Sequence, residues 1–315
     1  MSSIVTLTMN PAIDVSTSAD HVEPVHKLRC GEGRRDPGGG GINVARVVGR
    51  LGAEVTAVYP VGGFTGQLLN RMVDAEGLKS LTVPVLGEAR MDFTVLDRTT
   101  CEQYRFVMPG PELVEAEWTA CLNVLGGLGA RPEIICASGS LPPGVPDDFY
   151  ARVARIARSW DAKLVLDASG APLKAALEAR VYLVKPSLRE LRELMGGPLD
   201  DQGALIMACR SLIQRGDTEV VALTLGADGA LMVTAGGAWR APGLPVQPVS
   251  TVGAGDSFLG AMVWALASTM SLEDSFRYGV AGGSAAVLAP GTGLCQPQDV
   301  RRLLTQVTLE RVSMQ

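Results

Sequence analysis

One stretch decides the fold of this chain: Val249-Ser250-Thr251-Val252-Gly253-Ala254-Gly255-Asp256-Ser257-Phe258-Leu259-Gly260. Its glycine turn leads into residues 258–266, which are apolar on nearly every side and so predict a helix that is buried on all faces. A turn that opens a buried helix leaves backbone N–H groups without intrahelical partners, at the positive end of the helix dipole. The stretch therefore predicts a binding site for an anion, above all for phosphate.

Asp256 stands at the mouth of this predicted site, where its negative charge would repel the anion. Two interpretations fit the stretch when it is taken alone. Asp is among the residues preferred at helix N-caps, so its carboxylate could serve only to cap the helix. Alternatively, the carboxylate is a catalytic base that is held against an incoming phosphoryl group.

The composition indicates an α/β protein without a nucleic-acid or membrane partner. Of the 315 residues, 47% are hydrophobic and only 5% are aromatic, and the 37 glycines suit closely packed strands and helices. The net charge of −5 argues against a broad nucleic-acid interface, and no apolar run reaches the ~18 residues of a membrane helix. Six scattered cysteines, without a Cys-x-x-Cys pair, favour reduced thiols. We therefore expect a cytoplasmic location.

A second glycine-rich loop precedes a helix near the start of the chain. Gly38-Gly39-Gly40-Gly41 is followed by apolar residues at 42, 44, 45, 48 and 51, which form one stripe of a helix. The loop is not a dinucleotide fingerprint, because Asn43 stands where that motif needs its third glycine, and it lacks the Gly-Lys-Ser/Thr of a Walker loop. Taken alone, the run could be a ligand loop or a tight turn.

Strands alternate with helices through most of the chain, which predicts a largely parallel sheet. We expect strands at 4–9, 54–59, 133–137, 163–167, 181–184, 220–224 and 230–233, with helices between them. Several strands end in polar residues, namely Ser138 with Ser140, Asp167 with Ser169, and Lys185. Because parallel strands present their carboxyl ends at one edge of the sheet, we expect a ligand site there, with Asp14 in the loop after the first strand.

One region interrupts the α/β pattern. Alternating runs at 91–95 and 103–108 flank a polar turn at 97–100, as in a β-hairpin. We interpret the hairpin as a small accessory β layer that covers a site, with Arg90 and Arg105 at its flanks. Since no linker or repeat is visible, we expect a single domain over residues 1–315, with lid segments at roughly 12–36 and 81–108.

Together these features resemble the ribokinase-like (PfkB) family of carbohydrate kinases, and most of all its 6-phosphofructokinase branch. Two signatures stand in the family's order, residues 37–46 around the glycine run and residues 250–257, which match Thr-x-Gly-Ala-Gly-Asp. The stretches 138–144 and 183–186 agree with the family, and 27–30 and 102–110 agree with the branch. The resemblance implies a three-layer α/β/α ribokinase-like fold with a mostly parallel central sheet and a small β-sheet lid.

The resemblance also implies an activity, an ATP-dependent transfer of the γ-phosphoryl group to the C1 hydroxyl of fructose 6-phosphate. Asp256 would then be the base, and the N–H groups of Gly253, Ala254 and Gly255 the anion hole. Tagatose-6-phosphate kinase and 1-phosphofructokinase are alternatives within the class. A sugar-phosphate sensor without catalysis is the alternative outside it.

The family's contacts carry over to this chain by position. The sugar phosphate would bind Asp14, Gly38, Gly39, Asn43, Arg90, Arg105 and Ser140, with Lys27 reaching in from the partner subunit of a homodimer joined through the lids. The nucleotide would bind Lys185, Ser187, Thr224, Gly226, Gly229, Val252 and Gly283. The small residues that include Gly283 also mean that a neighbouring helix or a flat ring packs closely there.

The resemblance implies metal ions as well. Mg²⁺ would accompany ATP and be held by Glu190 and, through water, by Asp167. In the family's Asn-x-x-Glu motif, this chain has Ser187 in place of Asn, which bears on metal or nucleotide use. A monovalent cation such as K⁺ would be held by backbone carbonyls of Ser250, Val252, Ala286 and Gly291.

Overall fold

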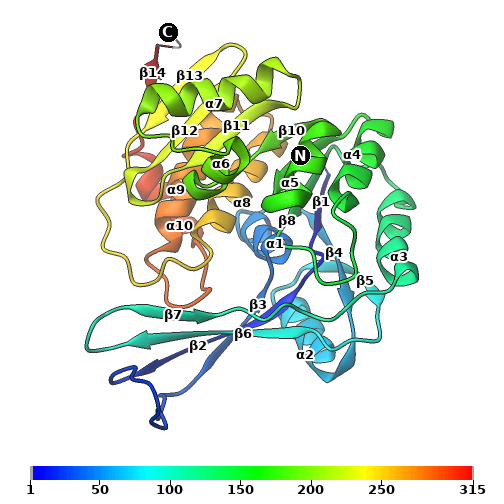
Figure 1. The fold of residues 1–315 in the computed structure, drawn as a ribbon, viewed down its shortest axis with the longest axis vertical. Coiled ribbons are helices and arrows are strands. Elements are labelled where there is room, and N and C mark those ends of the chain that lie inside the picture. Colours follow the sequence, from blue (N-terminus) through cyan, green and yellow to red (C-terminus); the bar gives the residue numbers. More distant parts are fainter. Residues whose placement is uncertain (1–2, 314–315) are drawn as a thin grey trace.

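The computed structural model describes residues 3–313, whose strands form one sheet of ten strands and one of four (Figure 1). The large sheet has the strand order β14 (Glu310–Val312), β13 (Gly237–Ala241), β12 (Ala230–Thr234), β11 (Thr218–Thr224), β10 (Val181–Val184), β9 (Lys163–Asp167), β8 (Ile134–Ser138), β1 (Ile4–Leu7), β4 (Val55–Val61) and β5 (Lys79–Pro84). Neighbouring strands from β11 to β5 pair in parallel, and neighbouring strands from β11 to β14 pair antiparallel.

Helices cover both faces of the large sheet. One core contains residues of α1 (Gly40–Arg50), α2 (Gly63–Ala75), α8 (Ala254–Ala267), α9 (Leu272–Ala286) and α10 (Pro297–Leu304). The other contains residues of α3 (Glu115–Gly126), α4 (Phe149–Ser159), α5 (Gly170–Glu178), α6 (Leu188–Met195) and α7 (Gln202–Gln214). Successive strand residues point to opposite faces, so Ile134 belongs to the first core and Ile135 to the second. The predicted three-layer α/β/α fold is confirmed.

The small sheet is the predicted second β layer, and Figure 1 shows it at the bottom of the view, extending away from the helices. It consists of β3 (Arg34–Gly38), β2 (Ala12–Ala19), β6 (Arg90–Asp97) and β7 (Gln103–Phe106), in that order. The predicted hairpin is the antiparallel pair β6–β7, whereas β2 and β6 pair in parallel. The sheet therefore joins two segments that are distant in sequence.

Two details of the sequence expectations are wrong. Asp14 does not lie in a loop, because the chain passes from β1 through Asn10 and Pro11 directly into β2, where Asp14 pairs with Asp36 and Asp92. Residues 81–84 do not belong to the small sheet but to β5, at the edge of the large one. An edge strand is half exposed, so β5 shows the same alternating pattern as the strands of a small sheet.

The glycines of α9 bring its backbone close to α8. A Cβ added at Gly282 would lie 2.6 Å from the Ala261 Cβ and 2.7 Å from the Ser257 carbonyl oxygen, and one at Gly279 would lie 3.1 Å from the Phe258 ring. The small residues of α9 are therefore explained by a neighbouring helix.

None of the helices within residues 3–313 is long and apolar enough to cross a membrane.

Candidate active site

A cavity of about 270 Å³ lies between the small sheet and the carboxyl ends of the parallel strands. The helices α1 and α8 both begin at its wall, each after a glycine turn. The predicted site residues that line it are Asp14, Gly39, Asn43, Arg90, Arg105, Ser140, Asp167, Glu190, Val252, Gly253 and Asp256. The structure thus brings both signatures and the arginines flanking the hairpin into one cavity.

The start of α8 is built by Gly253, which is the N-cap and has a left-handed φ of 76°. A residue with a Cβ is disfavoured in this conformation, which explains the glycine. Asp256 lies in the first turn of α8 and is not its cap. The interpretation of Asp256 as a capping residue is therefore wrong, and its carboxylate is free to serve the cavity.

Asn43 of α1 is the hydrogen-bond partner of that carboxylate, because its Nδ2 donates to Asp256 Oδ2 over 2.8 Å. Burial raises the pKa of Asp256 to about 6, and the negative charge of Asp167 adds to the rise, while the hydrogen bond from Asn43 opposes it. A carboxylate with a pKa near neutrality can hold a proton taken from an alcohol, so the position suits a general base.

Asp14 is a second carboxylate with a raised pKa in the cavity. Its Oδ2 accepts a hydrogen bond of 2.8 Å from the hydroxyl of Thr292, a buried residue just after α9. Burial raises the pKa of Asp14 to about 6, although the hydrogen bond from Thr292 opposes the rise. A Cβ at position 38 would lie 2.5 Å from the Asp14 carboxyl carbon, so any residue other than glycine would displace that carboxylate. Gly38 thus has a packing role beside its predicted contact.

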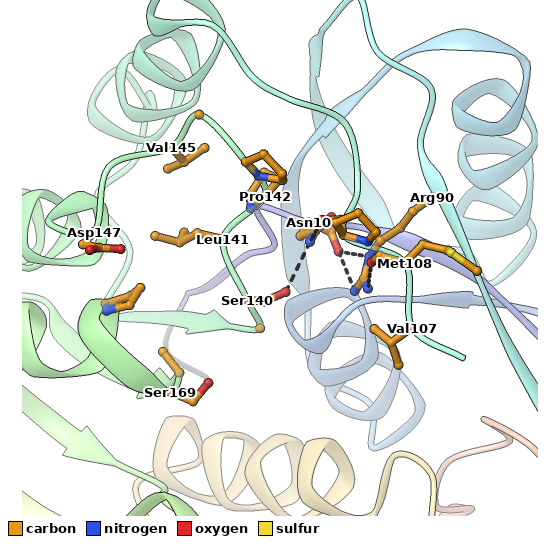
Figure 2. A pocket seen from close by; sticks show the side chains of 16 residues that line it. Asn10, Arg90, Val107, Met108, Ser140, Leu141, Pro142, Val145, Asp147 and Ser169 are labelled. Carbon is orange, nitrogen blue, oxygen red and sulfur yellow. Dashed lines mark hydrogen bonds between the residues drawn. The ribbon is translucent and has the colours of Figure 1, made fainter. Parts of the chain in front are cut away.

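Arg90 is held at the border of the cavity by backbone carbonyls. It donates to Asn10 O over 3.2 Å and to Met108 O over 2.9 Å, and it pairs with Asp92 at 2.9 Å. Figure 2 shows the Arg90 side chain pointing toward Asn10 and Met108, on one side of a neighbouring cavity of about 600 Å³. On the same side, Asn10 Nδ2 donates to Ser140 Oγ over 3.2 Å. Arg90 therefore enters the cavity in a fixed orientation.

Arg105 also lines the cavity of about 270 Å³, but its side chain is exposed. It lies on β7, opposite Thr94 of β6, at the outer part of the small sheet. Lys27 lies farther out, exposed in the loop between β2 and β3, and is not among the residues that line the cavity within the described chain. One protomer therefore does not bring Lys27 to its own site.

Lys185 and Asp167 form a buried ion pair beside the start of α8. Their Nζ and Oδ1 atoms are 3.1 Å apart, and a Cβ added at Gly255 would lie 3.5 Å from the same Nζ. Burial raises the pKa of Asp167, whereas the carboxylates of Asp167 and Glu190 together raise the pKa of Lys185 against the opposing effect of burial. The ammonium group is therefore charged, next to the predicted anion hole.

Ser187 and Glu190 cap α6 reciprocally. Ser187 N donates to Glu190 Oε2 over 2.8 Å, and Glu190 N donates to Ser187 Oγ over 3.3 Å. This is a capping box, so the serine that replaces the family's asparagine has a structural role here. Glu190 still lines the cavity.

The remaining predicted nucleotide residues lie away from the cavity lining within residues 3–313. Thr224 ends β11 and donates its N–H to Pro186 O over 3.0 Å, which places it beside Ser187. Gly226 begins the short 3₁₀ helix η1 (Gly226–Asp228), where an added Cβ would have open space around it. At Gly229, by contrast, a Cβ would lie 2.2 Å from the Ala241 carbonyl, so that glycine is required by packing.

The proposed carbonyl ligands for a monovalent cation belong to two adjacent segments. The N–H groups of Val249 and Ser250 both donate to Val287 O, over 2.7 and 3.3 Å, which holds residues 249–252 against the end of α9. The Ala286 carbonyl already accepts a hydrogen bond of 3.0 Å from Ala289 N. Gly291 has a left-handed φ of 57°.

Sequence reasoning missed several residues of the cavity. Asp92 lines the cavity and Thr292 contacts Asp14 in it, yet neither stands in a motif that points to a role in binding. Arg46, behind the cavity, carries a signal in the sequence, because this charged residue lies four residues after Ile42 and shares its buried helix face.

The sequence of residues 3–299 matches the model of the pfkB family carbohydrate kinases. This chain belongs to that family. It is 46% identical over 299 residues to a Mycobacterium tuberculosis protein named ATP-dependent 6-phosphofructokinase isozyme 2, with 95% of this chain and 88% of the relative covered. It is 38% identical over 305 residues to the Escherichia coli protein of the same name, covering 95% and 97%.

Solved structures agree with this assignment to the family. The structure of E. coli phosphofructokinase-2 in complex with fructose-6-phosphate has a TM-score of 0.90 at 37% identity, covering 97% of this chain and 99% of that one. The same enzyme in complex with potassium gives a TM-score of 0.92 at 38% identity and the same coverage. The PfkB kinases therefore share both the sequence signatures and the fold of this chain.

Proposed function

We propose that this protein is an ATP-dependent 6-phosphofructokinase, which transfers the γ-phosphoryl group of ATP to the C1 hydroxyl of fructose 6-phosphate. The observation that carries the proposal is Asp256, whose carboxylate has a raised pKa and lies in the first turn of a helix that begins with Gly253. The relatives named 6-phosphofructokinase, at 46% and 38% identity over nearly the whole chain, support it.

In this mechanism the carboxylates of Asp14 and Asp256 have different tasks. Asp14 accepts a hydrogen bond from a sugar hydroxyl and so orients the sugar, together with the backbone at Gly38 and Gly39. Asp256 accepts the proton of the attacking hydroxyl, and Asn43 holds its carboxylate in place through the 2.8 Å hydrogen bond. The proton leaves the hydroxyl oxygen as that oxygen forms its bond to phosphorus.

The start of α8 stabilises the charge that develops on the transferred group. The N–H groups of Gly253, Ala254 and Gly255 lie at the start of α8, where Ala254 N donates a long hydrogen bond of 3.4 Å to Thr251 O, and the Lys185 ammonium lies close to Gly255. Phosphoryl transfer depends mainly on positioning and charge stabilisation, which these groups supply. The sugar's own phosphate would be bound by Arg90 and Arg105, at the opposite end of the cavity.

The donor set fits Mg²⁺ that arrives with the nucleotide. Residues 3–313 contain no cluster of three or more His, Cys, Asp or Glu side chains suited to a metal, so they provide no site in which all ligands are protein side chains. Mg²⁺ commonly binds through one or two carboxylates, water and substrate phosphates, which Asp167 and Glu190 can accommodate. When bound, it neutralises phosphate charge. A K⁺ ion at residues 250–252 and 286–291 is proposed alongside, supported by the relative that was solved with potassium.

The nucleotide would bind Thr224, Gly226 and Gly229, at the end of β11, and Gly283 on α9.

We further propose a homodimer in which the small sheets meet and Lys27 enters the partner's site. The exposed apolar side chains of Phe93 and Phe106, which pair across β6 and β7, support such a contact. The six cysteines form no disulfide in the described chain, which is in keeping with a cytoplasmic location.

The activity is tested with a panel of phosphosugars and measurement of ADP. We expect fructose 6-phosphate to give the highest kcat/KM, ahead of tagatose 6-phosphate and fructose 1-phosphate. Relatives named 1-phosphofructokinase also match, at 32% identity for the Borreliella burgdorferi protein, so fructose 1-phosphate is the main competitor. No ADP formation with any phosphosugar would favour a sensor without catalysis instead.

The mechanism is tested with Asp256→Asn, which removes the base but keeps a side chain of the same shape. We expect fructose 6-phosphate binding, measured by calorimetry, to be retained while kcat falls by about 10²–10⁴-fold. A kcat of Asp256→Asn close to that of the unsubstituted enzyme would refute the assignment of Asp256 as the base.

A further inference from the structure

A buried arginine lies behind the cavity and does not line it. Arg46 of α1 has a side chain that is only 1% exposed, although burying a guanidinium group in a protein is costly unless all its donors are used. Its Nε donates to Glu76 Oε1 over 2.9 Å, and its Nη2 lies 2.8 Å from the same oxygen. Burial lowers the pKa of Arg46, while the carboxylate of Glu76 opposes that effect. A charge kept at such a cost needs an explanation beyond packing.

The remaining terminal nitrogen of Arg46 connects three segments that form the cavity wall. Its Nη1 donates to Pro37 O over 2.9 Å, to Asn43 Oδ1 over 3.3 Å and to Thr292 O over 3.2 Å. Asn43 donates a hydrogen bond to Asp256 and Thr292 donates one to Asp14, both over 2.8 Å. Arg46 Nη1 therefore contacts both Asn43 and Thr292 on the side away from the cavity.

The contact with Asn43 also selects the orientation of its amide group. Arg has only donors, so the amide edge that faces it must be the carbonyl oxygen. The amide nitrogen is then turned toward Asp256, whose carboxylate can only accept when it is ionised. Arg46 and the Asp256 carboxylate therefore favour the same orientation of the amide, and Arg46 adds to the preference that the carboxylate alone would give.

We propose that Arg46 is a positioning residue for the reaction: it acts through Asn43 to orient Asp256, and through Thr292 to orient Asp14. This inference rests on the proposed function, because it assigns Arg46 a task in the same site. Arg46 is not among the residues that line the cavity in the described part of the chain. Its effect on kcat would therefore pass through Asn43 and its effect on sugar binding through Thr292, which makes the proposal testable by coupling.

The chain offers a matched control in Arg50, one turn further along α1. Arg50 Nη2 donates to both oxygens of Glu76, over 3.0 and 3.1 Å, and its Nη1 donates to Gly293 O over 2.7 Å. It thus shares the carboxylate partner of Arg46 and contacts the residue after Thr292. None of its recorded hydrogen bonds in residues 3–313 goes to Asn43.

The test is a double-mutant cycle on the full-length enzyme with Arg46→Met, Asn43→Ala and the combined variant. We expect each single change to lower kcat by about tenfold, the size of one lost hydrogen bond, with KM for ATP unchanged within about twofold. Because both changes disable the same contact to Asp256, the combined variant should be no slower than the slower single variant. Arg46→Met should also raise KM for fructose 6-phosphate, through Thr292. Arg50→Met should retain kcat within about twofold.

A second variant separates positioning from stability, since Arg46→Met also leaves Glu76 without one of its cations. Arg46→Lys keeps a positive charge but lacks the forked group that reaches Glu76 and Asn43 together. We expect it to restore the melting temperature relative to Arg46→Met without restoring kcat. Multiplicative losses in the cycle, or full kcat in Arg46→Lys, would overturn the inference while leaving the proposed function intact. Full kcat in both Asn43→Ala and Asp256→Asn would instead overturn the proposed mechanism itself, and the inference with it.

Discussion

The raised pKa of Asp256 predicts an acidic limit to turnover that an ordinary aspartate would not impose. Burial raises this pKa from 3.8 to about 6. A general base accepts a proton only when it is ionised, so kcat should fall as the pH drops through about 6. The sign follows from the direction of the shift: lowering the pH protonates the carboxyl group and removes the base.

The size of the effect follows from the same value. At pH 5 a group with a pKa of about 6 is about one-tenth ionised, so kcat should be about tenfold lower than at pH 7. With the usual value of 3.8, the group would stay ionised at pH 5 and kcat would hardly change. The two cases therefore differ by about a factor of ten in one measurement.

The assay measures ADP in quenched reactions at saturating fructose 6-phosphate and MgATP from pH 5 to pH 8, because coupling enzymes have pH limits of their own. Circular dichroism at each pH checks that the protein remains folded. The substrate phosphate also titrates near pH 6, so a control must show that the acidic limb of the kcat–pH profile, that is, the fall of kcat at low pH, arises from the enzyme. Since the Asn43 hydrogen bond lowers the pKa of Asp256, Asn43→Ala should move the limb to higher pH.

Asp14 needs its own control, because its pKa is also raised to about 6. In Asp14→Asn we expect KM for the sugar phosphate to rise while the acidic limb of kcat remains. A kcat that is flat between pH 7 and pH 5 would refute the assignment of the limb to Asp256. So would a limb that keeps its midpoint in Asn43→Ala.

Three further predictions concern packing and the sugar-phosphate contacts. Gly282→Ala should destabilise the protein by about 1–3 kcal/mol, because its Cβ would lie 2.6 Å from a side chain of α8. Gly126→Ala, whose Cβ would have open space around it, should not destabilise the protein. Equal melting temperatures of the two variants would contradict this prediction. Arg105→Ala should raise KM for fructose 6-phosphate by about tenfold or more and leave KM for ATP nearly unchanged, and equal changes in both would exclude the phosphate contact. Gly40→Ala would place a Cβ 2.2 Å from Ser138 Oγ and 2.9 Å from its carbonyl carbon, so kcat/KM should collapse; a normal value would show that α1 can shift without harm.

The sequence predicted those parts of the site that depend on local backbone geometry. Both glycine turns begin helices, as the patterns at 38–41 and 253–255 indicate, and both helices reach the same cavity. The strand ends at Ser138 and Asp167 also lie there, because parallel strands share one edge. Hydrophobic periodicity and the positions of glycines are local signals, so they can be recognised in the sequence without knowledge of the fold.

What the sequence did not predict depends on contacts between distant segments. Asp14 looks like a loop residue because the second sheet that pairs with it is formed by residues 34–38 and 90–97, far along the chain. Its partner Thr292 is 278 residues away, and no local pattern marks such a pair. The short strands at 237–241 and 310–312 were missed as well, because they lie toward an edge of the sheet, where a few residues carry little hydrophobic periodicity.

The hydrogen bond between Asn43 and Asp256 also bears on how the enzyme comes into being, because it joins residues that are 213 positions apart. At a translation rate of about 5–20 residues per second, the ribosome adds Asp256 roughly 10–40 s after Asn43. Until α8 docks, a nascent chain lacks the proposed base, so we expect it to consume no ATP. In refolding of the full-length chain, turnover should return no earlier than this contact between α1 and α8.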